Sequence, residues 1–184
     1  MALRYILKED DQQLYKVSRE VRDFNGRIHT LLDDMRETLL AADGVGLAAP
    51  QVGVLRRAVI VMDTTKEDLT PEEQIIELIN PVIIASEGEQ EGAEGCLSVP
   101  GVYGIVKRPN KVTVRAFDRF GKEFEITGEG LTARAFCHEI DHLEGHIFKE
   151  FTTHLLTPEE LEAMNNESGD DNSTETDNPE GAAE

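Results

Sequence analysis

Apolar residues recur every three or four positions between residues 25 and 42, with charged side chains between them. The repeat consists of Ile28, Leu31, Leu32, Met35 and Leu39. This spacing places the apolar side chains on one face of an α-helix. We therefore predict an amphipathic helix from Asn25 to Ala42.

After residue 57 the pattern changes to short apolar or alternating segments, which are typical of β-strands. The predicted strands cover residues 57–63, 75–84, 103–107, 111–118 and 122–127, and a weaker strand-like segment covers 3–7. Asn80-Pro81 either divides the second strand or places it at a sheet edge. Arg119-Phe120-Gly121 predicts a hairpin turn between the last two strands.

A second helical pattern starts near residue 130. Thr132 is a candidate N-cap, Ile140 and Leu143 continue the apolar face, and Gly145 is a typical C-terminal stop. A helix, several mostly antiparallel strands and then one central helix together predict an α+β fold, with mostly antiparallel sheets packed around that helix.

The end of the chain differs in composition from the rest. Thr157-Pro158-Glu159-Glu160 resembles a capping box and should open a short helix to about Met164. From residue 165 onward no apolar cluster occurs, so we expect one folded domain over residues 1–164 and an acidic, disordered tail over 165–184. No apolar run could span a bilayer and no secretory signal is evident, so we expect a cytoplasmic protein with no membrane partner.

Charge narrows the classes of partner. The 184 residues carry a formal net charge of -19, and ten of the acidic residues lie between 159 and 184, which leaves -19 + 10 = -9 on the rest. This balance argues against a direct nucleic-acid site. The two cysteines, Cys96 and Cys137, are not expected to form a disulfide in a reducing compartment.

The candidate chemistry lies in the segment His138-Glu139-Ile140-Asp141-His142. Two histidines four positions apart share a helix face and can bind one metal ion, while Glu139 can act as a base beside it. Cys96 can supply a third ligand from a Gly-rich turn, although a free cysteine is often only a small buried apolar residue. Cys137 leaves the helix about 100° from His138 and is expected to pack in the core.

The segment Gly44 to Gly53 superficially fits a dinucleotide-binding fingerprint. That fingerprint requires a strand before it and a helix after it. Here a helix precedes it, and Pro50 and Gly53 oppose a helix after it, so we do not expect nucleotide binding. The small residues instead allow a close approach of the backbone to a ligand. Gln51 can donate from its amide to a carbonyl oxygen, or it can bind its own loop.

Three segments together resemble the signature motifs of the peptide deformylase family, in the right order and with similar spacing. They are Gly44 to Gln51, Glu94 to Ser98 and His138 to Leu143, and the likeness covers roughly residues 5–150. One departure is Cys137, where many members carry glutamine. The resemblance implies a metal-dependent hydrolase that removes the N-formyl group from the formyl-methionine of new polypeptides and releases formate.

The resemblance also implies roles for residues. Cys96, His138 and His142 would bind the metal, and Glu139 would be the general base. The Gln51 side chain and the Leu97 N–H would stabilise the oxyanion. The expected substrate-binding residues are Gly46, Val45, Gly95, Leu97, Leu131 and Cys137. Glu94 is expected to be buried and paired with Arg108.

The implied cofactor is one divalent ion, Fe2+ in cells, with Zn2+ or Ni2+ able to replace it. The implied partners are formyl-methionyl nascent peptides and the ribosome near its exit tunnel. Two alternatives stay open from the residues alone. One is a His-Glu-x-x-His metallopeptidase with Glu162 as third ligand. The other is an inactive peptide-binding homologue with a structural metal. Such a site needs four protein ligands, and no fourth is evident in the sequence, because the nearby His146 and His154 are expected to lie on the surface.

Overall fold

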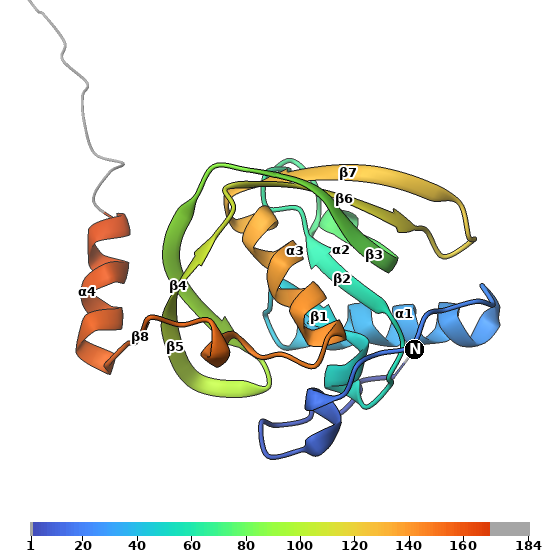
Figure 1. Cartoon of the computed structure of the whole chain (residues 1–184), viewed down its shortest axis with the longest axis horizontal. Coiled ribbons are helices and arrows are strands. Elements are labelled where there is room, and N and C mark those ends of the chain that lie inside the picture. Colours follow the sequence, from blue (N-terminus) through green and yellow to red (C-terminus); the bar gives the residue numbers. More distant parts are fainter. Residues whose placement is uncertain (1, 170–184) are drawn as a thin grey trace, which may run out of the picture.

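Two antiparallel sheets and a helix between them organise residues 2–169, which are the residues that the computed structural model describes (Figure 1). The larger sheet has the strand order β1-β2-β3-β6-β7 and the smaller has β4-β5-β8. Helix α3 contacts strands of both sheets, so the predicted α+β architecture with a central helix is confirmed.

The elements follow one another in a simple order. The α-helices are α1 (Gly26–Ala41), α2 (Pro71–Gln74), α3 (Gly130–Leu143) and α4 (Pro158–Gly169). The strands are β1 (Gly46–Ala48), β2 (Ala58–Met62), β3 (Ile75–Glu87), β4 (Gln90–Cys96), β5 (Val99–Arg108), β6 (Lys111–Phe117), β7 (Glu123–Glu129) and β8 (His154–Leu155). Three short 3-10 helices are η1 (Gln12–Tyr15), η2 (Ala49–Val52) and η3 (Phe148–Glu150).

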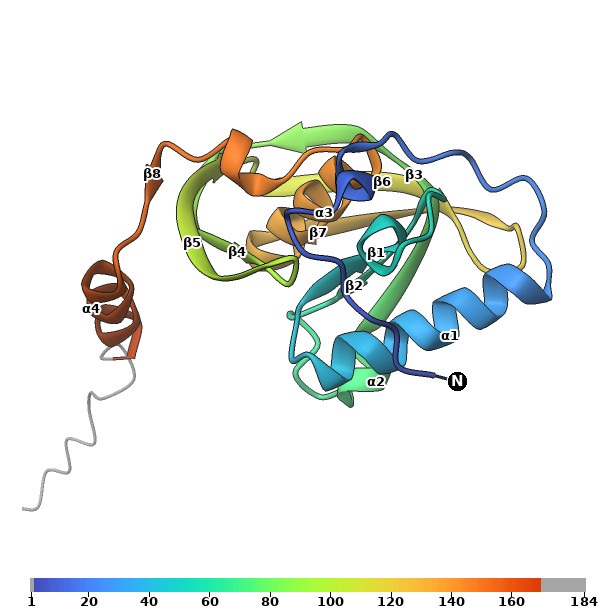
Figure 2. The same cartoon turned by 90° about the horizontal axis from the view of Figure 1, so that it is seen from below.

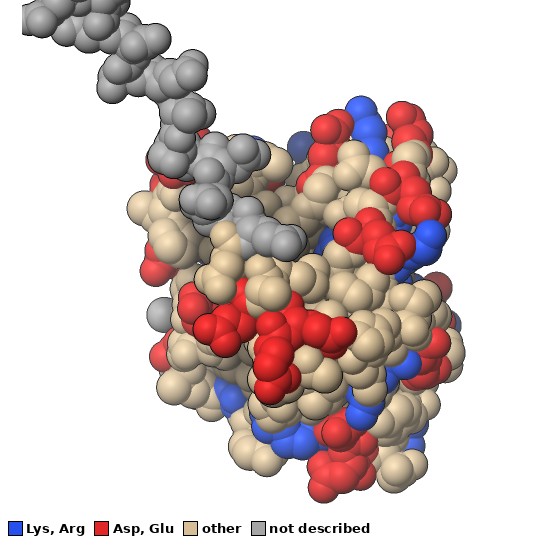
Figure 3. Space-filling view, turned by 90° about the vertical axis from the view of Figure 1, so that its left-hand side faces the viewer, with Lys and Arg blue, Asp and Glu red and all other residues tan. Residues whose placement is uncertain are grey.

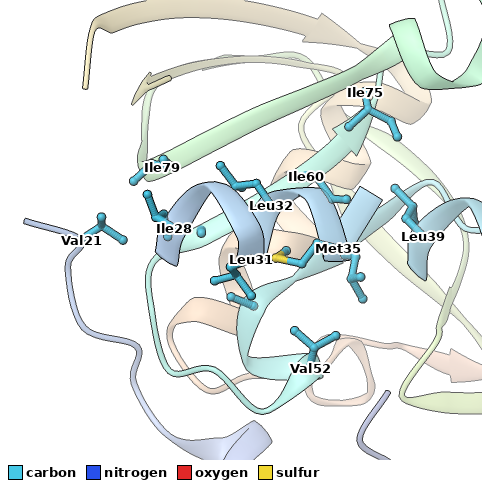
Figure 4. Packing of buried hydrophobic residues seen from close by; sticks show 13 residues of the cluster. Val21, Ile28, Leu31, Leu32, Met35, Leu39, Val52, Ile60, Ile75 and Ile79 are labelled. Carbon is cyan, nitrogen blue, oxygen red and sulfur yellow. The ribbon is translucent and has the colours of Figure 1, made fainter. Parts of the chain in front are cut away.

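Helix α1 forms as its apolar spacing predicts. The Asn25 side chain caps its first turn by accepting a hydrogen bond of 2.9 Å from the Arg27 N–H. All five residues of the apolar repeat are buried, and they pack against β2 and β3 through Ile60 and Ile79 (Figure 4). This cluster fixes one end of α1 beside the loop that leads into β1.

Helix α3 begins two residues before the predicted cap. Thr132 is not the N-cap, because it is buried inside the helix and its hydroxyl lies 3.2 Å from that of Thr64. Gly145 follows the helix with φ +81°, as expected of a C-terminal stop. A Cβ at Gly145 would lie 2.7 Å from the backbone of Tyr15, so this close approach also requires glycine.

Three strand predictions need correction. Residues 3–7 form no strand, because their N–H groups bond to helix α1 and to the Gln51 carbonyl rather than to a ladder. Strand β3 runs through Asn80-Pro81 without dividing, and it lies between β2 and β6 rather than at a sheet edge, so neither alternative holds. A register shift between Ile79 and Val82 accommodates the proline. Strand β4 was not predicted, because its polar, Gly-containing sequence shows no alternation and it forms by pairing with β5.

Helix α4 extends farther than predicted. The Thr157 and Glu160 side chains exchange the expected capping hydrogen bonds, but the helix continues past Met164 to Gly169. Residues 165–169 are therefore helical rather than disordered, and the rest of the predicted tail lies outside the described residues. Figure 2 shows α4 projecting from the small sheet. None of the described helices is long and apolar enough to cross a membrane.

Candidate active site

The predicted ligand residues meet at one point between the sheets. His138 and His142 are buried on one face of α3, and Cys96 ends strand β4 opposite them. Their donor atoms all lie within 4.8 Å of one another, and Cys96 Sγ is 3.3 Å from His142 Nε2. A cysteine at the end of a strand and two helical histidines thus converge from segments about 40 residues apart.

A buried carboxylate orients the first histidine. His138 Nδ1 lies 3.0 Å from Glu94 Oε2, which leaves Nε2 of the ring for the cluster. A histidine that donates its other ring N–H to a carboxylate is a recurrent arrangement in metal sites, because it fixes the ring and raises its basicity. The positions of both residues therefore favour a metal ligand at His138.

The charge of Glu94 is neutralised by two arginines. Arg108 donates to both of its carboxylate oxygens at 2.8 and 3.1 Å, and Arg134 donates at 3.0 Å. Burial alone would raise the pKa of Glu94, but hydrogen bonds from His138 and Arg108 outweigh it and lower the pKa to about 2. The expected Glu94–Arg108 pair is confirmed, and Arg108 also binds Asp141 at 2.8 Å.

The candidate base has a free oxygen. Glu139 is buried, and its Oε2 has no hydrogen-bond partner among the described residues. Burial raises the pKa of this carboxyl to about 7. Strand β1 passes so close that a Cβ on Gly46 would lie 2.5 Å from Glu139 Oε1. Glycine at this position therefore gives the carboxylate its space.

The donor set fits a single transition-metal ion. One thiol and two imidazoles suit zinc or ferrous iron. The orientation of His138 by Glu94 and the unpartnered Oε2 of Glu139 are both what such a site requires. Three protein ligands would leave a position open for water or substrate.

A cavity of about 550 Å³ opens beside this cluster. The predicted wall residues that line it are Val45, Gly46, Gly95, Leu97 and Leu131, together with Gln51. Cys137 does not line it, because its thiol is buried in the core cluster on the other side of α3. The prediction of Cys137 as a pocket wall is therefore corrected in favour of the packing role.

Gln51 binds its own loop, which is one of the two contacts that the sequence left open. Its Oε1 accepts a hydrogen bond from the Ala48 N–H at 2.8 Å within its own loop. Its Nε2 points the other way, 3.2 Å from Ser98 Oγ and 3.5 Å from Cys96 Sγ. The loop bond thus aims the amide donor at the cluster.

Gly95 lines the cavity, and its lack of a side chain also has a packing reason. A Cβ at this position would lie 2.5 Å from the ring of Tyr103 on the paired strand β5. The residue lacks a side chain to admit this ring at the cavity wall, which is a packing reason that the sequence did not show.

The N-terminal segment contributes contacts that sequence reasoning missed. Lys8 Nζ donates to the Leu97 carbonyl at 2.9 Å, and the Glu9 N–H donates to the Ser98 carbonyl at 3.0 Å. The Leu7 N–H donates to the Gln51 carbonyl at 2.8 Å. One short segment therefore ties together both loops that face the cluster. No local pattern in the sequence indicates the role of Lys8. Arg134, by contrast, lies four residues before His138 on the same helix face, and this spacing could have indicated its place beside the site.

The alternative ligands lie elsewhere. Glu162 is exposed on α4, and the cluster of possible ligands found among the described residues does not include it. His146 pairs with Glu150 at 2.8 Å, and His154 pairs with Glu160 at 3.0 Å. Neither the peptidase ligand set nor a closed four-ligand site is therefore supported.

Comparison with known proteins gives a consistent picture. A family model described as polypeptide deformylase matches residues 3–155. A peptide deformylase of Caldanaerobacter subterraneus subsp. tengcongensis is 54% identical over 89% of this chain and 98% of its own length. The crystal structure of a peptide deformylase from Legionella pneumophila matches with a TM-score of 0.75 and 43% identity, over 92% of this chain and 99% of that one. That of Thermotoga maritima peptide deformylase matches with a TM-score of 0.77 and 30% identity, over 83% and 99%.

Proposed function

The chain belongs to the polypeptide deformylase family, and we propose that the cluster between α3 and β4 is where it carries out that family's reaction. It is a hydrolase that removes the N-formyl group from the N-terminal formyl-methionine of newly made polypeptides and releases formate. The observation that carries this assignment is the cluster of half-buried Cys96 with buried His138 and His142, and with Glu139 beside it.

Cys96, His138 and His142 hold the metal in this proposal. When bound, the ion supplies Lewis acidity to the formyl carbonyl and lowers the pKa of a water beside it from about 15.7 towards 7. Glu139 accepts a proton from the attacking water, for which its unpartnered Oε2 is suited, and returns it to the departing amine.

The remaining groups stabilise charge and hold the peptide. The Gln51 amide and the Leu97 N–H donate to the developing oxyanion, and loss of one such donor typically costs about 2.7–4 kcal/mol. The Gly46 backbone holds the substrate in extended form, as an added strand. Val45, Gly95, Leu97 and Leu131 line the cavity that takes the methionine side chain.

Ferrous iron is the ion we assign in cells, with zinc or nickel able to replace it, because one thiolate and two imidazoles accommodate all three. A ferrous site with a thiolate ligand is expected to be sensitive to oxygen. Anaerobic purification should then raise the formate released per mole of protein, and no gain would count against iron.

Formylated nascent chains are the substrate, and the ribosome near its exit tunnel is the partner that this substrate favours. The same reasoning favours a cytoplasmic location. Residues 1–164 form the catalytic unit in this proposal, and residues 165–184 take no part in the chemistry.

The test is formate release from formyl-Met-Ala-Ser by anaerobically purified protein, with metal content measured on the same sample. Glu139→Gln should keep the metal but lower the rate by about 10²–10⁴-fold, since the proton transfer is lost. Cys96→Ala is the companion variant and should lose the metal. Metal retained by Cys96→Ala, or an unchanged rate in Glu139→Gln, would contradict the assignment.

A further inference from the structure

A second groove, of about 800 Å³, lies at the N-terminal end of α1, away from the active site. Its polar lining consists mainly of arginines, namely Arg4, Arg19, Arg22, Arg27 and Arg56. Its apolar lining consists of Val21, Ile28, Leu31 and Val54. Five of the eleven arginines of the chain thus line one groove, and no lysine lines it.

Arginines outside the groove are all paired with acids. The six are Arg36, Arg57, Arg108, Arg115, Arg119 and Arg134, and each has at least one salt bridge. Within the groove only Arg4 has one, to Asp34 at 2.9 Å. The other four groove arginines are exposed and have no salt bridge to any described residue.

This lack of partners is not explained by a shortage of acids. The chain has 37 acidic residues against 18 basic ones, yet Glu20 and Asp23, which also line the groove, pair with none of the four arginines. Two like charges also lie side by side, because the backbones of Arg19 and Arg56 pair in an isolated parallel β-bridge. A bound anion would relieve this repulsion.

We propose that this arginine groove binds the phosphodiester backbone of RNA. Guanidinium groups match phosphate oxygens in a bidentate geometry, and several of them on separate segments suit successive phosphates. No aromatic side chain lines the groove, so bases have nothing to stack on, and contact with the backbone alone is independent of sequence. The choice of RNA rests on the proposed function, because a nascent polypeptide is attached to an RNA-rich ribosome.

The arginine groove lies far enough from the active-site cavity for both to be occupied at the same time. The C-terminal end of α1 leads into Ala42, Asp43 and Gly44, which line the active-site cavity, whereas Arg27 lies in its first turn. The 16 residues of α1 separate the two sites by about 24 Å. RNA in the groove therefore leaves the cavity open to a peptide.

The acidic surface elsewhere restricts the orientation of binding. Figure 3 shows acidic side chains gathered on the face that carries α4 and the small sheet, and Figure 2 shows α4 at the opposite end of the molecule from the start of α1. The acidic face repels a phosphate backbone and the arginine groove attracts it. The protein should therefore approach RNA with the end that carries the groove. The net charge, which argued against nucleic acid, conceals this uneven distribution.

The test is titration of the full-length protein with an RNA duplex of about 20 base pairs at several salt concentrations. Four phosphate contacts predict that the affinity falls about 50–150-fold between about 50 and about 200 mM salt. Arg22→Gln combined with Arg27→Gln should lower the slope of log K against log salt by about 1.4–1.8. Lys107→Gln combined with Lys111→Gln removes the same charge from exposed pairs elsewhere and should leave binding unchanged.

Several results would overturn the proposal. They are no binding of RNA at low salt, equal loss in both double variants, or tighter binding of a DNA duplex of the same sequence. Binding of a poly-glutamate peptide without any binding of RNA would assign the groove to an acidic protein instead. Formate release from formyl-Met-Ala-Ser, measured on the same samples, should be unchanged in all variants. Failure of that activity in the wild type would concern the proposed function and not the groove.

Discussion

The two sides of the active site are held in different ways. On the α3 side, Glu94 is buried together with Arg108, Arg134 and His138, and hydrogen bonds link the four residues. On the cavity side, the walls are half open, since Val45 and Tyr103 are 40% and 38% exposed. Main-chain carbonyls there are held by the short N-terminal segment that carries Lys8.

This difference shows how one site can combine precision with tolerance. Ligand atoms must keep fixed distances, and buried, mutually paired charges achieve that because losing one partner leaves another charge uncompensated. A cavity that receives many different peptides gains little from such rigidity. Substitutions on the first side should therefore affect stability and metal affinity, and those on the second side should affect turnover alone.

The largest expected effect comes from Glu94→Ala, which removes the central carboxylate from the hydrogen-bond network on the α3 side. Arg108 and Arg134 would both remain buried without this carboxylate, so the free energy of unfolding should fall by about 3–5 kcal/mol. His138 would lose its orienting partner, and metal affinity should fall about 10–100-fold. Urea unfolding and competition with a chelator measure the two effects.

The matched control is Glu125→Ala on β7, which removes a carboxylate from an exposed pair with Arg115. Exposed pairs contribute at most about 1 kcal/mol. Equal losses of stability in the two variants would mean that the buried network is not what distinguishes the α3 side.

The next largest effect should come from Gly46→Ala, which creates a steric clash between β1 and helix α3. The new Cβ would meet the Glu139 carboxylate, so either β1 or the carboxylate must move. Displacement of a catalytic group by about 1 Å can cost about 10²-fold, and we expect a fall of that size in kcat/KM for formyl-Met-Ala-Ser with metal content unchanged. Gly26→Ala is the control, because nothing lies within 4 Å of its Cβ and activity should not change.

Local patterns predicted the elements that have strong periodicity or a distinct stop. The apolar repeat gave α1 to within one residue at each end, and Gly145 correctly marked the end of α3. Strand β4 escaped prediction because its stability comes from pairing with β5, which no local pattern encodes. Thr132 was misassigned as a cap because burial against Thr64 gives its hydroxyl another partner.

For the site, spacing on a helix gave both histidines and the base, since four residues make about one turn. The Gly-rich sequence around them made Cys96 a candidate third ligand and Gln51 a candidate donor, and the resemblance to a family favoured these roles over burial or a loop contact. The contact of Lys8 with Leu97 could not be foreseen, because one side-chain hydrogen bond joins two residues that are 89 positions apart in the sequence. Cys137 faces the core, and only the packing of α3 decided which side of the helix it would occupy.

The smallest effect should come from Lys8→Met, which removes one contact on the cavity side and leaves the α3 side unchanged. The variant keeps the length of the side chain but loses the hydrogen bond to the Leu97 carbonyl, so the loop that carries Leu97 should be less well fixed. A hydrogen bond from a charged donor contributes about 1.5–3 kcal/mol. The low end of that range, expected for a half-buried lysine, corresponds to about a tenfold loss in kcat/KM. Lys8→Arg can still donate and should restore most of the activity, while Lys16→Met, at an exposed position outside the cavity, should have no effect. Steady-state release of formate together with urea unfolding measures the series. A loss of stability in Lys8→Met comparable to that of Glu94→Ala would mean that the open side is as rigidly built as the α3 side.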